Sequence, residues 1–334
     1  MKIAVIGAGA WGTGLSLVLA RRKHDVRLWA REQEVVRSIA EKRENQPFLP
    51  GHKLPEQIIA SHDFDEVLNG AGLIVWVTPS EHCRATLRAM SALLAPGVPI
   101  ISATKGVEND SLMRMTEVIA DELNKQGKSA ELAAISGPSF AQEVARGDPT
   151  AISVASKNSE LANLVQREFS GPSFRVYTSD DVTGVELGGA LKNVIAIAAG
   201  ICDGLGLGHN TIAALITRGL AEITRLAVAC GARRETLAGL SGMGDLVLTC
   251  TGGLSRNRSV GVELGRGRKL PEIVAGMHGM VAEGVLTTNA AVGLARQRGI
   301  EMPISEQMYA ILHNGKAPRD AIQELMARPG KGEA

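Results

Sequence analysis

Short apolar runs recur through the first half of the chain, and each is followed by a stretch with helical spacing. The runs are rich in β-branched residues and poor in polar ones, which is typical of strands buried on both faces of a parallel sheet. Strands that alternate with helices indicate an α/β fold with a doubly wound sheet. The predicted strands are residues 2–6, 25–30, 58–61, 72–77, 98–103 and 131–136, with 150–155 and 174–178 as an extension of the sheet that could be antiparallel. The predicted helices between them are residues 13–22, 34–42, 84–94 and 111–125, and the Pro- and Gly-punctuated stretch 44–51 is predicted to be a loop.

The pattern changes at Ser179. Strand-like runs nearly vanish beyond this residue, and helical periodicity continues to the end of the chain. The 334 residues are enough for two domains of ~150 residues each. We therefore predict a doubly wound α/β domain over residues 1–180 and an all-helical domain over residues 181–334, with a hinge near residues 180–185.

A glycine-rich turn joins the first predicted strand to the first predicted helix. Gly7, Gly9 and Gly12 form a GxGxxG pattern in the strand–turn–helix context of a Rossmann-type dinucleotide-binding domain. The first glycine permits the tight turn, the second lets the backbone approach a diphosphate, and the third lets the helix pack against the strand. The diphosphate would then bind the free N–H groups at the helix N-terminus. Ordinary strand-to-helix turns can carry the same pattern, but this context favours dinucleotide binding.

The end of the second predicted strand bears on the choice of cofactor. NAD-specific folds usually place an acidic residue there, ~20 residues beyond the glycines, to hold the ribose 2′-hydroxyl. This chain has Arg31 instead, and a guanidinium suits the 2′-phosphate of NADPH. The alternative is a solvated surface arginine, and the adjacent Glu32 softens the preference. We expect NADPH or NADH as cofactor, with NADPH favoured.

Two further predicted strands end in polar residues. Ligands of open α/β sheets bind beyond the carboxyl ends of the strands, so Lys105, which follows one strand, could hold an anionic substrate. After the next strand, Ser136-Gly137-Pro138-Ser139 is predicted to begin a helix whose N–H groups and hydroxyl could bind a polar substrate. Taken alone, Lys105 is explained equally well as a surface lysine, and the serine stretch is better explained as a helix cap.

The stretch 185–200 is a predicted helix that carries one lysine among small and apolar residues. Its core-facing stripe is predicted to contain Leu187, Leu191, Val194, Ile195 and Ala198, with Gly189, Lys192 and Asn193 on another face. Partial burial would lower the pKa of the Lys192 ammonium, which suits a general acid or base. The alternative is a lysine at a helix edge whose ammonium reaches water.

Two polar stretches complete the candidate site. Asp245 is predicted to lie in the glycine-rich turn 241–246, where it could orient a lysine or bind a substrate hydroxyl, although acids in such turns are often plain caps. Farther along, Ser255, Arg256 and Asn257 stand where a helix is predicted to begin. A helix N-terminus with an arginine and two neutral donors forms a good phosphate site. A basic helix start is otherwise unfavourable for the helix dipole, so Arg256 indicates a bound anion.

Composition and charge bear on which partners, compartment and cofactors the protein can have. A formal net charge of +1 favours neither nucleic acid nor a membrane surface as a partner. We expect no apolar run of the ~20 residues that a membrane span needs, no signal peptide and no stable membrane insertion. The four cysteines are scattered without a CxxC pair, which fits reduced thiols in the cytoplasm better than disulfides or a metal site. The small-residue helices of the second half could form a dimer face, and we expect a homodimer.

Several motifs, in this order and spacing over nearly the whole chain, resemble those of the bacterial NAD(P)-dependent glycerol-3-phosphate dehydrogenases. They are residues 7–12 (GAGAWG), 104–106 (TKG), 136–141 (SGPSFA), 191–193 (LKN), 242–245 (GMGD), 255–258 (SRNR) and 281–284 (VAEG). Together they are highly specific, whereas none would be so alone. Ala10 is a small departure, because the family often has serine there. Alanine in place of serine removes one hydroxyl near the diphosphate and leaves the backbone N–H groups in place.

The resemblance implies a role for each matching residue. Lys192 matches the family's proton donor and acceptor. The implied glycerol-3-phosphate contacts are Lys105, Gly137, Ser139, Lys192, Asp245, Ser255, Arg256 and Asn257. The implied cofactor contacts are Gly7, Gly9, Ala10, Trp11, Gly12, Arg31, Lys105, Ala141, Arg256, Val281 and Glu283. Asn193 and Thr249 also match family site positions, with a weaker correspondence.

The resemblance and the residue patterns together predict a reversible NAD(P)H-dependent reduction of dihydroxyacetone phosphate to sn-glycerol 3-phosphate, a precursor of glycerophospholipids, without a metal. One rival is a related two-domain dehydrogenase acting on other hydroxy acids, which would need a carboxylate site rather than the phosphate site at residues 255–258. The other is an NADPH-sensing regulator, which could dispense with Lys192 and Asp245 and would usually carry its own recognition module.

Overall fold

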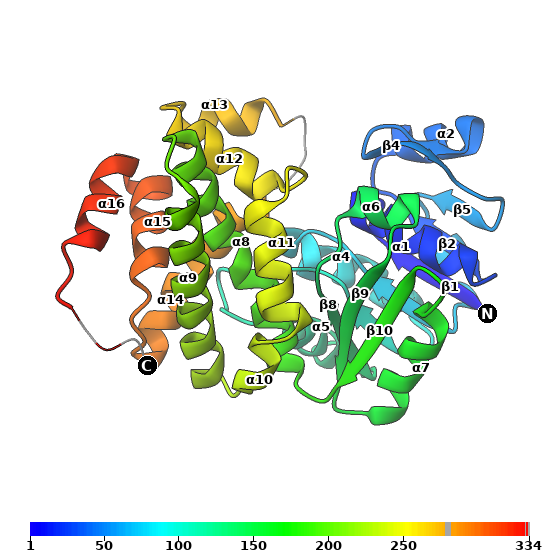
Figure 1. The fold of residues 1–334 in the computed structure, drawn as a ribbon. Coiled ribbons are helices and arrows are strands. Elements are labelled where there is room, and N and C mark those ends of the chain that lie inside the picture. The colour runs from blue at the N-terminus through cyan, green and yellow to red at the C-terminus, as the bar shows by residue number, and fades with distance from the viewer. Residues whose placement is uncertain (278–281, 331, 333–334) are drawn as a thin grey trace.

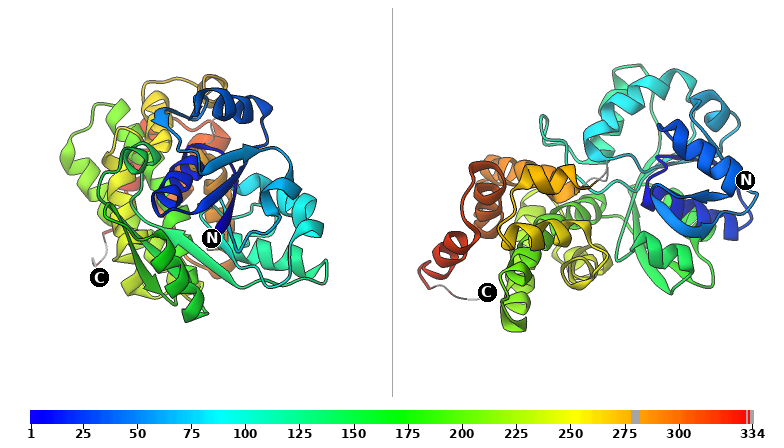
Figure 2. Two further views of the ribbon diagram at one scale, coloured as in Figure 1. Left: turned by 90° about the vertical axis from the view of Figure 1, so that its right-hand side faces the viewer. Right: turned by 90° about the horizontal axis from the view of Figure 1, so that it is seen from above.

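The computed structural model describes residues 1–277, 282–330 and 332. An α/β half that contains the N-terminus and a helical half that contains the C-terminus lie side by side (Figures 1 and 2). The strands of the large sheet are β1 (Lys2–Ile6), β2 (Asp25–Trp29), β5 (Ile58–Ser61), β6 (Leu73–Trp76), β7 (Ile100–Ser102), β8 (Leu132–Ser136), β9 (Thr150–Ser156) and β10 (Phe174–Ser179). The helices of this half are α1 (Ala10–Arg21), α2 (Gln33–Lys42), α3 (Phe64–Leu68), α4 (Cys83–Met90), α5 (Met115–Asn124), α6 (Ala141–Arg146) and α7 (Ser159–Phe169).

The large sheet has the strand order β10-β9-β8-β7-β6-β1-β2-β5. Every neighbouring pair is parallel except β8 and β9, so the predicted extension of the sheet contains one antiparallel step and then a parallel one. The chain runs from β1 outward to β2 and β5, then returns to β6 on the other side of β1. Ligands of such sheets bind in the crevice where the strand order reverses, which here lies beyond the carboxyl ends of β1 and β6.

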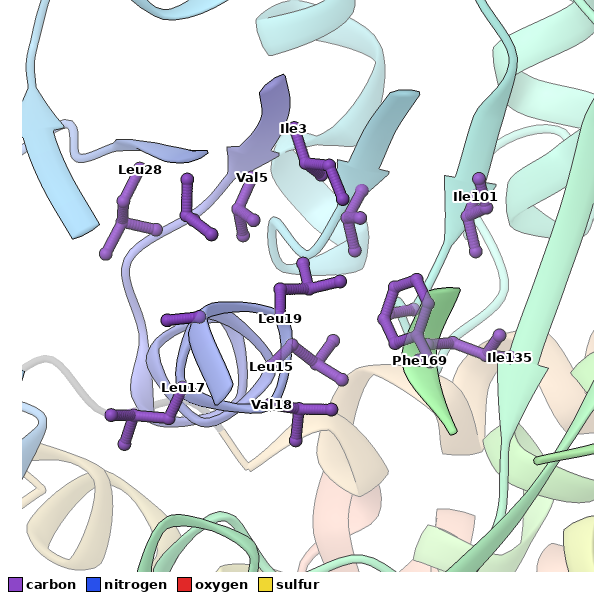
Figure 3. Packing of buried hydrophobic residues seen from close by; sticks show 14 of the residues in the cluster. Ile3, Val5, Leu15, Leu17, Val18, Leu19, Leu28, Ile101, Ile135 and Phe169 are labelled. Carbon is purple, nitrogen blue, oxygen red and sulfur yellow. The ribbon is translucent and has the colours of Figure 1, made fainter. Parts of the chain in front are cut away.

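Helix α1 covers one face of this sheet. Leu15 and Leu19 are four residues apart and therefore lie on one side of the helix, facing the strand side chains of Ile3 and Val5 (Figure 3). All four side chains are completely buried. Burying a side chain of this size contributes about 1.5–3 kcal/mol, so this contact fixes the start of α1 against the sheet and hence the position of the glycine turn.

The helical half is built around one central helix, α8. It comprises α8 (Val182–Gly204), α9 (His209–Ala229), α10 (Arg234–Leu237), α11 (Asp245–Thr251), α12 (Arg256–Gly265), α13 (Leu270–Ala275), α14 (Glu283–Arg298), α15 (Pro303–Asn314) and α16 (Pro318–Met326). A π-helical turn, Leu240–Gly244, leads into α11. From Val182 onward the described residues form helices and their connections, and the division of the chain at residue 180 stays a prediction.

The predicted apolar stripe of α8 is too narrow. Nearly every residue from Val182 to Cys202 is buried, including Lys192 and Asn193, because α9, α11, α12 and α14 all pack around the helix.

The expectation that no apolar run is long enough for a membrane span is also wrong. Over 18 residues the mean hydropathy of α8 reaches 1.5, enough by length and composition for a membrane span, but this whole window is buried inside the protein.

Glycines allow α8 and α12 to approach closely. A Cβ atom at Gly261 in α12 would lie 2.0 Å from the carbonyl oxygen of Ile197 and 2.9 Å from the Cα atom of Gly200, both in α8. One turn farther along, Gly204 and Gly265 repeat the arrangement. The two backbones are therefore in direct contact, which places the N-terminus of α12 beside the middle of α8.

A buried ion pair joins the two halves. Glu186 in α8 accepts hydrogen bonds from the backbone N–H and the hydroxyl of Thr116 at the start of α5, at 2.8 and 2.7 Å, and pairs with Arg114 at 2.6 Å. Because breaking such a pair leaves one charge buried without a partner, this contact holds the first turn of α8 against the α/β half.

Several local predictions differ from the structure. Residues 44–51 belong to a small antiparallel hairpin, β3 (Glu44–Asn45) and β4 (Leu49–Lys53), rather than a loop. Helix α5 begins only at Met115, because an isolated bridge between Val107 and Arg114 occupies the preceding residues. Helix α4 ends at Met90 and continues as a short 3₁₀ turn.

Glu222 provides a prediction about stability. This buried carboxylate in α9 accepts hydrogen bonds from the N–H groups of Ile304 and Ser305 at the start of α15, and burial raises its pKa to about 7. The folded state therefore holds this proton more tightly than the unfolded state, and stability should fall as pH rises from about 4.5 to about 7. Denaturant unfolding of wild type and Glu222→Gln should show wild type losing ~2 kcal/mol relative to the variant between pH 5 and pH 8. A difference that does not change with pH would contradict this role.

Candidate active site

In the glycine turn after β1, two of the three glycines pack against neighbouring backbone and the third faces open space. Gly7 has a φ of +122°, and a Cβ atom on it would lie 2.7 Å from the carbonyl oxygen of Val77 after β6. A Cβ atom on Gly12 would lie 1.8 Å from the carbonyl oxygen of Gly7, whereas one on Gly9 would meet nothing within 4 Å. The turn therefore needs glycine at the first and third positions for its shape, while the second faces open space.

The first turn of α1 fits a bound diphosphate. The helix begins at Ala10 without a side-chain cap or an acidic residue in its first turn, so its leading N–H groups remain available for an anion. The indole nitrogen of Trp11 and the hydroxyl of Thr78 are buried beside this turn and the end of β6, and neither has a hydrogen-bond partner in the described part of the chain. Unsatisfied buried groups of this kind are costly, which fits a site built to hold a polar ligand.

Asn45, in the hairpin, fixes this turn, although it was not among the predicted site residues. Its side-chain amide donates hydrogen bonds of 2.8 Å to the carbonyl oxygen of Ala8 and to the hydroxyl of Thr13. The residue is completely buried. Residues 44–51 were predicted to be a loop of the kind that often folds over a site, but nothing in the sequence singles out Asn45, because its contacts depend on how the hairpin folds back over α1.

Arg31 lies beyond the end of β2, as predicted, and is paired with its neighbour. Its guanidinium donates to the Glu32 carboxylate at 2.9 Å; the Arg31 side chain is largely exposed and that of Glu32 is partly exposed. An exposed pair of this kind is worth about 0–1 kcal/mol, so Arg31 can exchange this partner for another anion.

Three residues that are far apart in sequence meet at the junction of the two halves. The ammonium of Lys192 in α8 lies 2.6 Å from one oxygen of the Asp245 carboxylate, and the ammonium of Lys105 lies 2.7 Å from the other. Lys192 also donates to the hydroxyl of Thr249 at 2.6 Å. These residues were predicted to share one site, and the structure brings them into direct contact.

Burial changes the acidity of Lys192. Loss of hydration lowers its pKa to about 8, helped by repulsion from Lys105 and opposed by the attraction of Asp245. A lysine with a pKa near neutrality can both give and take a proton under physiological conditions. The cluster is therefore suited to general acid–base chemistry at a group bound beside Lys192.

Close backbone contacts position the cluster. A Cβ atom on Gly189 would lie 2.2 Å from the hydroxyl oxygen of Ser136, and one on Gly188 would lie 2.6 Å from the carbonyl oxygen of Ser241. The paired glycines thus let α8 approach both β8 and the π-helical turn before α11. Asp245 is the first residue of α11 rather than part of a loose glycine turn, so the prediction of its local structure is wrong.

The Gly-Pro stretch after β8 supports Lys105. The carbonyl oxygen of Gly137 accepts a hydrogen bond from the Lys105 ammonium at 3.1 Å and another from the hydroxyl of Ser139 at 2.8 Å. Helix α6 begins later than predicted, at Ala141, and Ser139 does not cap it. Ala141 packs against Gly14 of α1, which places the start of α6 next to the dinucleotide turn.

The start of α12 matches the prediction for residues 255–257. Ser255 caps the helix by accepting the N–H of Arg258 at 3.2 Å. The Arg256 side chain is exposed to solvent, yet the surrounding protein lowers the pKa of its guanidinium while the nearby Glu283 raises it. Asn257 is buried and donates to Asn193 at 3.0 Å.

Glu283 joins the helical half to the end of β6. Its carboxylate accepts hydrogen bonds from the backbone N–H of Ser80 at 3.1 Å and from the Ser80 hydroxyl at 2.6 Å. Ser80 was not singled out from the sequence, although its place just after a predicted central strand was a usable signal. Val281 was predicted to contact the cofactor and lies outside the described residues.

Comparisons with known proteins agree on one family. Models described as the NAD-dependent glycerol-3-phosphate dehydrogenase N-terminus and C-terminus match residues 2–162 and 181–323. A glycerol-3-phosphate dehydrogenase (NAD(P)+) of Koribacter versatilis is 63% identical over 99% of this chain and 98% of its own length. One from Acidobacterium capsulatum is 54% identical over 99% of each chain.

Solved structures give the same result. Glycerol-3-phosphate dehydrogenase from Coxiella burnetii superposes with a TM-score of 0.94 at 43% identity, covering 98% of this chain and 99% of its own. D-mandelate dehydrogenase, at 14% identity and a TM-score of 0.62, shares the fold alone. The predicted fold class is confirmed, and the chain belongs to the NAD-dependent glycerol-3-phosphate dehydrogenase family.

Proposed function

We propose that the protein catalyses the reversible, NAD(P)H-dependent reduction of dihydroxyacetone phosphate to sn-glycerol 3-phosphate, which supplies glycerophospholipid synthesis. The observation that carries this proposal is the buried Lys192–Asp245–Lys105 cluster. It lies where the two halves meet, and chain segments from both the sheet and the helical half supply its members. Family membership supports the same reaction class.

Lys192 acts as the proton donor in reduction and the acceptor in oxidation. The nicotinamide, when bound, supplies or accepts the hydride at the substrate carbon. Asp245 holds the Lys192 ammonium at 2.6 Å, and Lys105, on the other carboxylate oxygen, polarises the substrate oxygen. The Thr249 hydroxyl accepts a second N–H of the Lys192 ammonium and so fixes its orientation. Together these contacts leave the remaining N–H of Lys192 for the substrate oxygen.

The phosphate end is assigned to the start of α12. Ser255 and Arg256 offer a helix N-terminus and a guanidinium to the dianion. Binding energy from this remote group helps to orient the carbonyl against the nicotinamide. The proposed substrate contacts are Lys105, Gly137, Ser139, Lys192, Asp245, Ser255, Arg256 and Asn257.

The cofactor is assigned to the glycine turn and its surroundings. The missing Cβ at Gly9 and the uncapped start of α1 support diphosphate binding there. The proposed cofactor contacts are Gly7, Gly9, Ala10, Trp11, Gly12, Arg31, Lys105, Ala141, Arg256, Val281 and Glu283. No group of side chains suited to a metal occurs in the described residues, and the proposed reaction uses none.

The deciding experiment follows the loss of nicotinamide absorbance when dihydroxyacetone phosphate is added to purified protein with NADPH or NADH. Rapid oxidation of either cofactor is expected. Parallel assays with 2-keto acids test the hydroxy-acid alternative. If NADPH binds but only a 2-keto acid is reduced, or nothing is, the proposed substrate is wrong.

NADPH is proposed as the preferred cofactor, and Glu32 limits that preference. Because Glu32 pairs with Arg31 and adds a negative charge beside the expected 2′-phosphate, Glu32→Gln should raise the ratio of kcat/KM for NADPH to that for NADH by about fivefold. The matched control is Glu41→Gln at the far end of α2, which should leave the ratio unchanged. A ratio that stays constant or falls in Glu32→Gln would contradict this role.

We also propose a cytoplasmic homodimer without nucleic-acid partners. All four cysteines are free thiols, which supports a reducing compartment. The helical half exposes large apolar side chains, among them Met243, Val247 and Leu254, which supports an interface between copies. Light scattering at micromolar concentration should give twice the mass of one chain, and a monomeric mass would contradict the dimer.

A further inference from the structure

One asparagine side chain links three helices of the candidate site. The amide nitrogen of Asn257 in α12 donates to the side-chain oxygen of Asn193 in α8 at 3.0 Å. Its amide oxygen accepts the backbone N–H of Gly284 in α14 at 2.9 Å. Both asparagines are buried. Each linked residue directly follows a proposed site residue, namely Lys192, Arg256 and Glu283.

The hydrogen-bond network fixes the orientation of both amides. The Gly284 N–H can only donate, so the oxygen of Asn257 must face it and the nitrogen must face Asn193. Asn193 must therefore turn its oxygen toward Asn257 and its N–H₂ group elsewhere. Asn257 thus decides which end of the amide of Asn193, the residue after Lys192, remains available for another partner.

The junction leaves no room for adjustment. A Cβ atom on Gly284 would lie 2.6 Å from the backbone carbonyl oxygen of Asn193 and 2.8 Å from the amide oxygen of Asn257. The start of α14 therefore rests directly on α8 and on the Asn257 side chain. A displacement of any one of the three helices must move the others.

We propose that Asn257 is a positioning residue that couples the phosphate end of the site to the Lys192 ammonium and to Glu283 on the cofactor side. This inference rests on the proposed function. It adds a second role to the direct substrate contact proposed above for Asn257. A contact with the phosphate matters only for a phosphorylated substrate, whereas a positioning residue also affects the reduction of an unphosphorylated substrate and the binding of the cofactor.

The first test is a double-mutant cycle. If Asn257 acts through Asn193, Asn257→Ala and Asn193→Ala should each lower kcat at saturating dihydroxyacetone phosphate by about tenfold, and the double variant should lose little more than either single one. Fully additive losses, or a rise in KM with unchanged kcat, would overturn the proposal.

The second test removes the phosphate. Asn257→Ala should lower kcat/KM for unphosphorylated dihydroxyacetone and should weaken NADPH binding, measured by nicotinamide fluorescence, because neither effect needs the dianion. The control is Ser259→Ala, which is exposed on the same helix and should change neither value. If Asn257→Ala kept both the wild-type kcat/KM for dihydroxyacetone and the wild-type affinity for NADPH, the proposal would be overturned.

Two further measurements keep the outcome interpretable. Thermal unfolding shows whether Asn257→Ala remains folded. If it does not, Asn257→Asp is the substitute, because it preserves the side-chain volume and the hydrogen bond from the Gly284 N–H. The second carboxylate oxygen cannot donate, so the Asn193 amide must turn its N–H₂ group toward it. This variant should reduce dihydroxyacetone more slowly than wild type and should bind NADPH with wild-type affinity. An unchanged rate in Asn257→Asp would overturn the coupling. If wild type fails to reduce dihydroxyacetone phosphate, the proposed function fails, and an Asn257→Ala loss of NADPH affinity still reports the link to α14.

Discussion

Substitution of Lys192 by methionine should reduce kcat for dihydroxyacetone phosphate reduction by about 10²–10⁴-fold, the range typical of a lost general acid. Methionine has a similar length and no proton to give, so the α8 backbone should keep its place among its neighbours. NADPH binding should survive, because the glycine turn lies in the other half of the molecule. Stopped-flow absorbance with saturating substrate and a fluorescence titration with NADPH measure the two effects separately.

The pH dependence of the wild-type protein offers an independent check on Lys192. Its pKa of about 8 means that the ammonium loses its proton as pH rises through that value. The kcat for reduction should then fall above pH 8, and the kcat for glycerol 3-phosphate oxidation should rise over the same range.

A kcat of Lys192→Met within tenfold of the wild-type kcat would contradict the assignment of Lys192 as the proton donor. Lys269→Met on the surface serves as the control.

The strands and the glycine turn could be predicted because their physical cause is local. A run such as residues 2–6 must be buried on both faces whatever its partners are, and the turn after it needs glycine for its own backbone shape. The same holds for the predicted helix start at Ser255, whose hydroxyl accepts the N–H three residues later. Such features depend on sequence neighbours alone.

Features that depend on distant contacts could not be predicted in this way. The periodicity of α8 suggested one apolar face, but the lysine face is buried as well, because Asp245 and Thr249 arrive from α11. Asn45 looks like an ordinary polar residue after a helix, and Ser80, although it follows a central strand, gives no sign of its partner Glu283. Their roles appear only when the hairpin folds over α1 and α14 reaches β6.

Asp245 shows how a correct chemical prediction can accompany a wrong local one. Its glycine-rich surroundings suggested a turn, but these glycines form a π-helical turn that continues into α11. A Cβ atom on Gly242 would lie 2.0 Å from the carbonyl oxygen of Leu237, so Gly242 serves close packing rather than chain reversal. The spacing of Asp245 and Thr249, four residues apart on one helix face, was the signal that could have revealed the helix.

Substitution of Gly261 by alanine should destabilise the protein by about 3 kcal/mol or more, even though alanine normally favours a helix by ~1 kcal/mol over glycine. The new Cβ would lie 2.0 Å from the carbonyl oxygen of Ile197, and real contacts of this kind stay beyond 3.0 Å. Neither backbone can yield locally, so α12 must move away from α8 and carry Ser255, Arg256 and Asn257 with it. Thermal and denaturant unfolding measure the loss, and KM for dihydroxyacetone phosphate should rise in whatever fraction remains folded.

Gly14→Ala in α1 is the matched control for Gly261→Ala. Gly14 is also a buried helical glycine, but its Cβ would lie 3.5 Å from the nearest atom, the carbonyl oxygen of Ala141, which is an ordinary van der Waals distance. Its stability should therefore stay constant or rise by up to ~1 kcal/mol, as helix propensity alone dictates. If Gly261→Ala behaved like Gly14→Ala, the direct contact between the α8 and α12 backbones could not be what positions the start of α12. The placement of the phosphate site would then have to depend on side-chain contacts such as the 2.9 Å pair between Arg258 and Asp203.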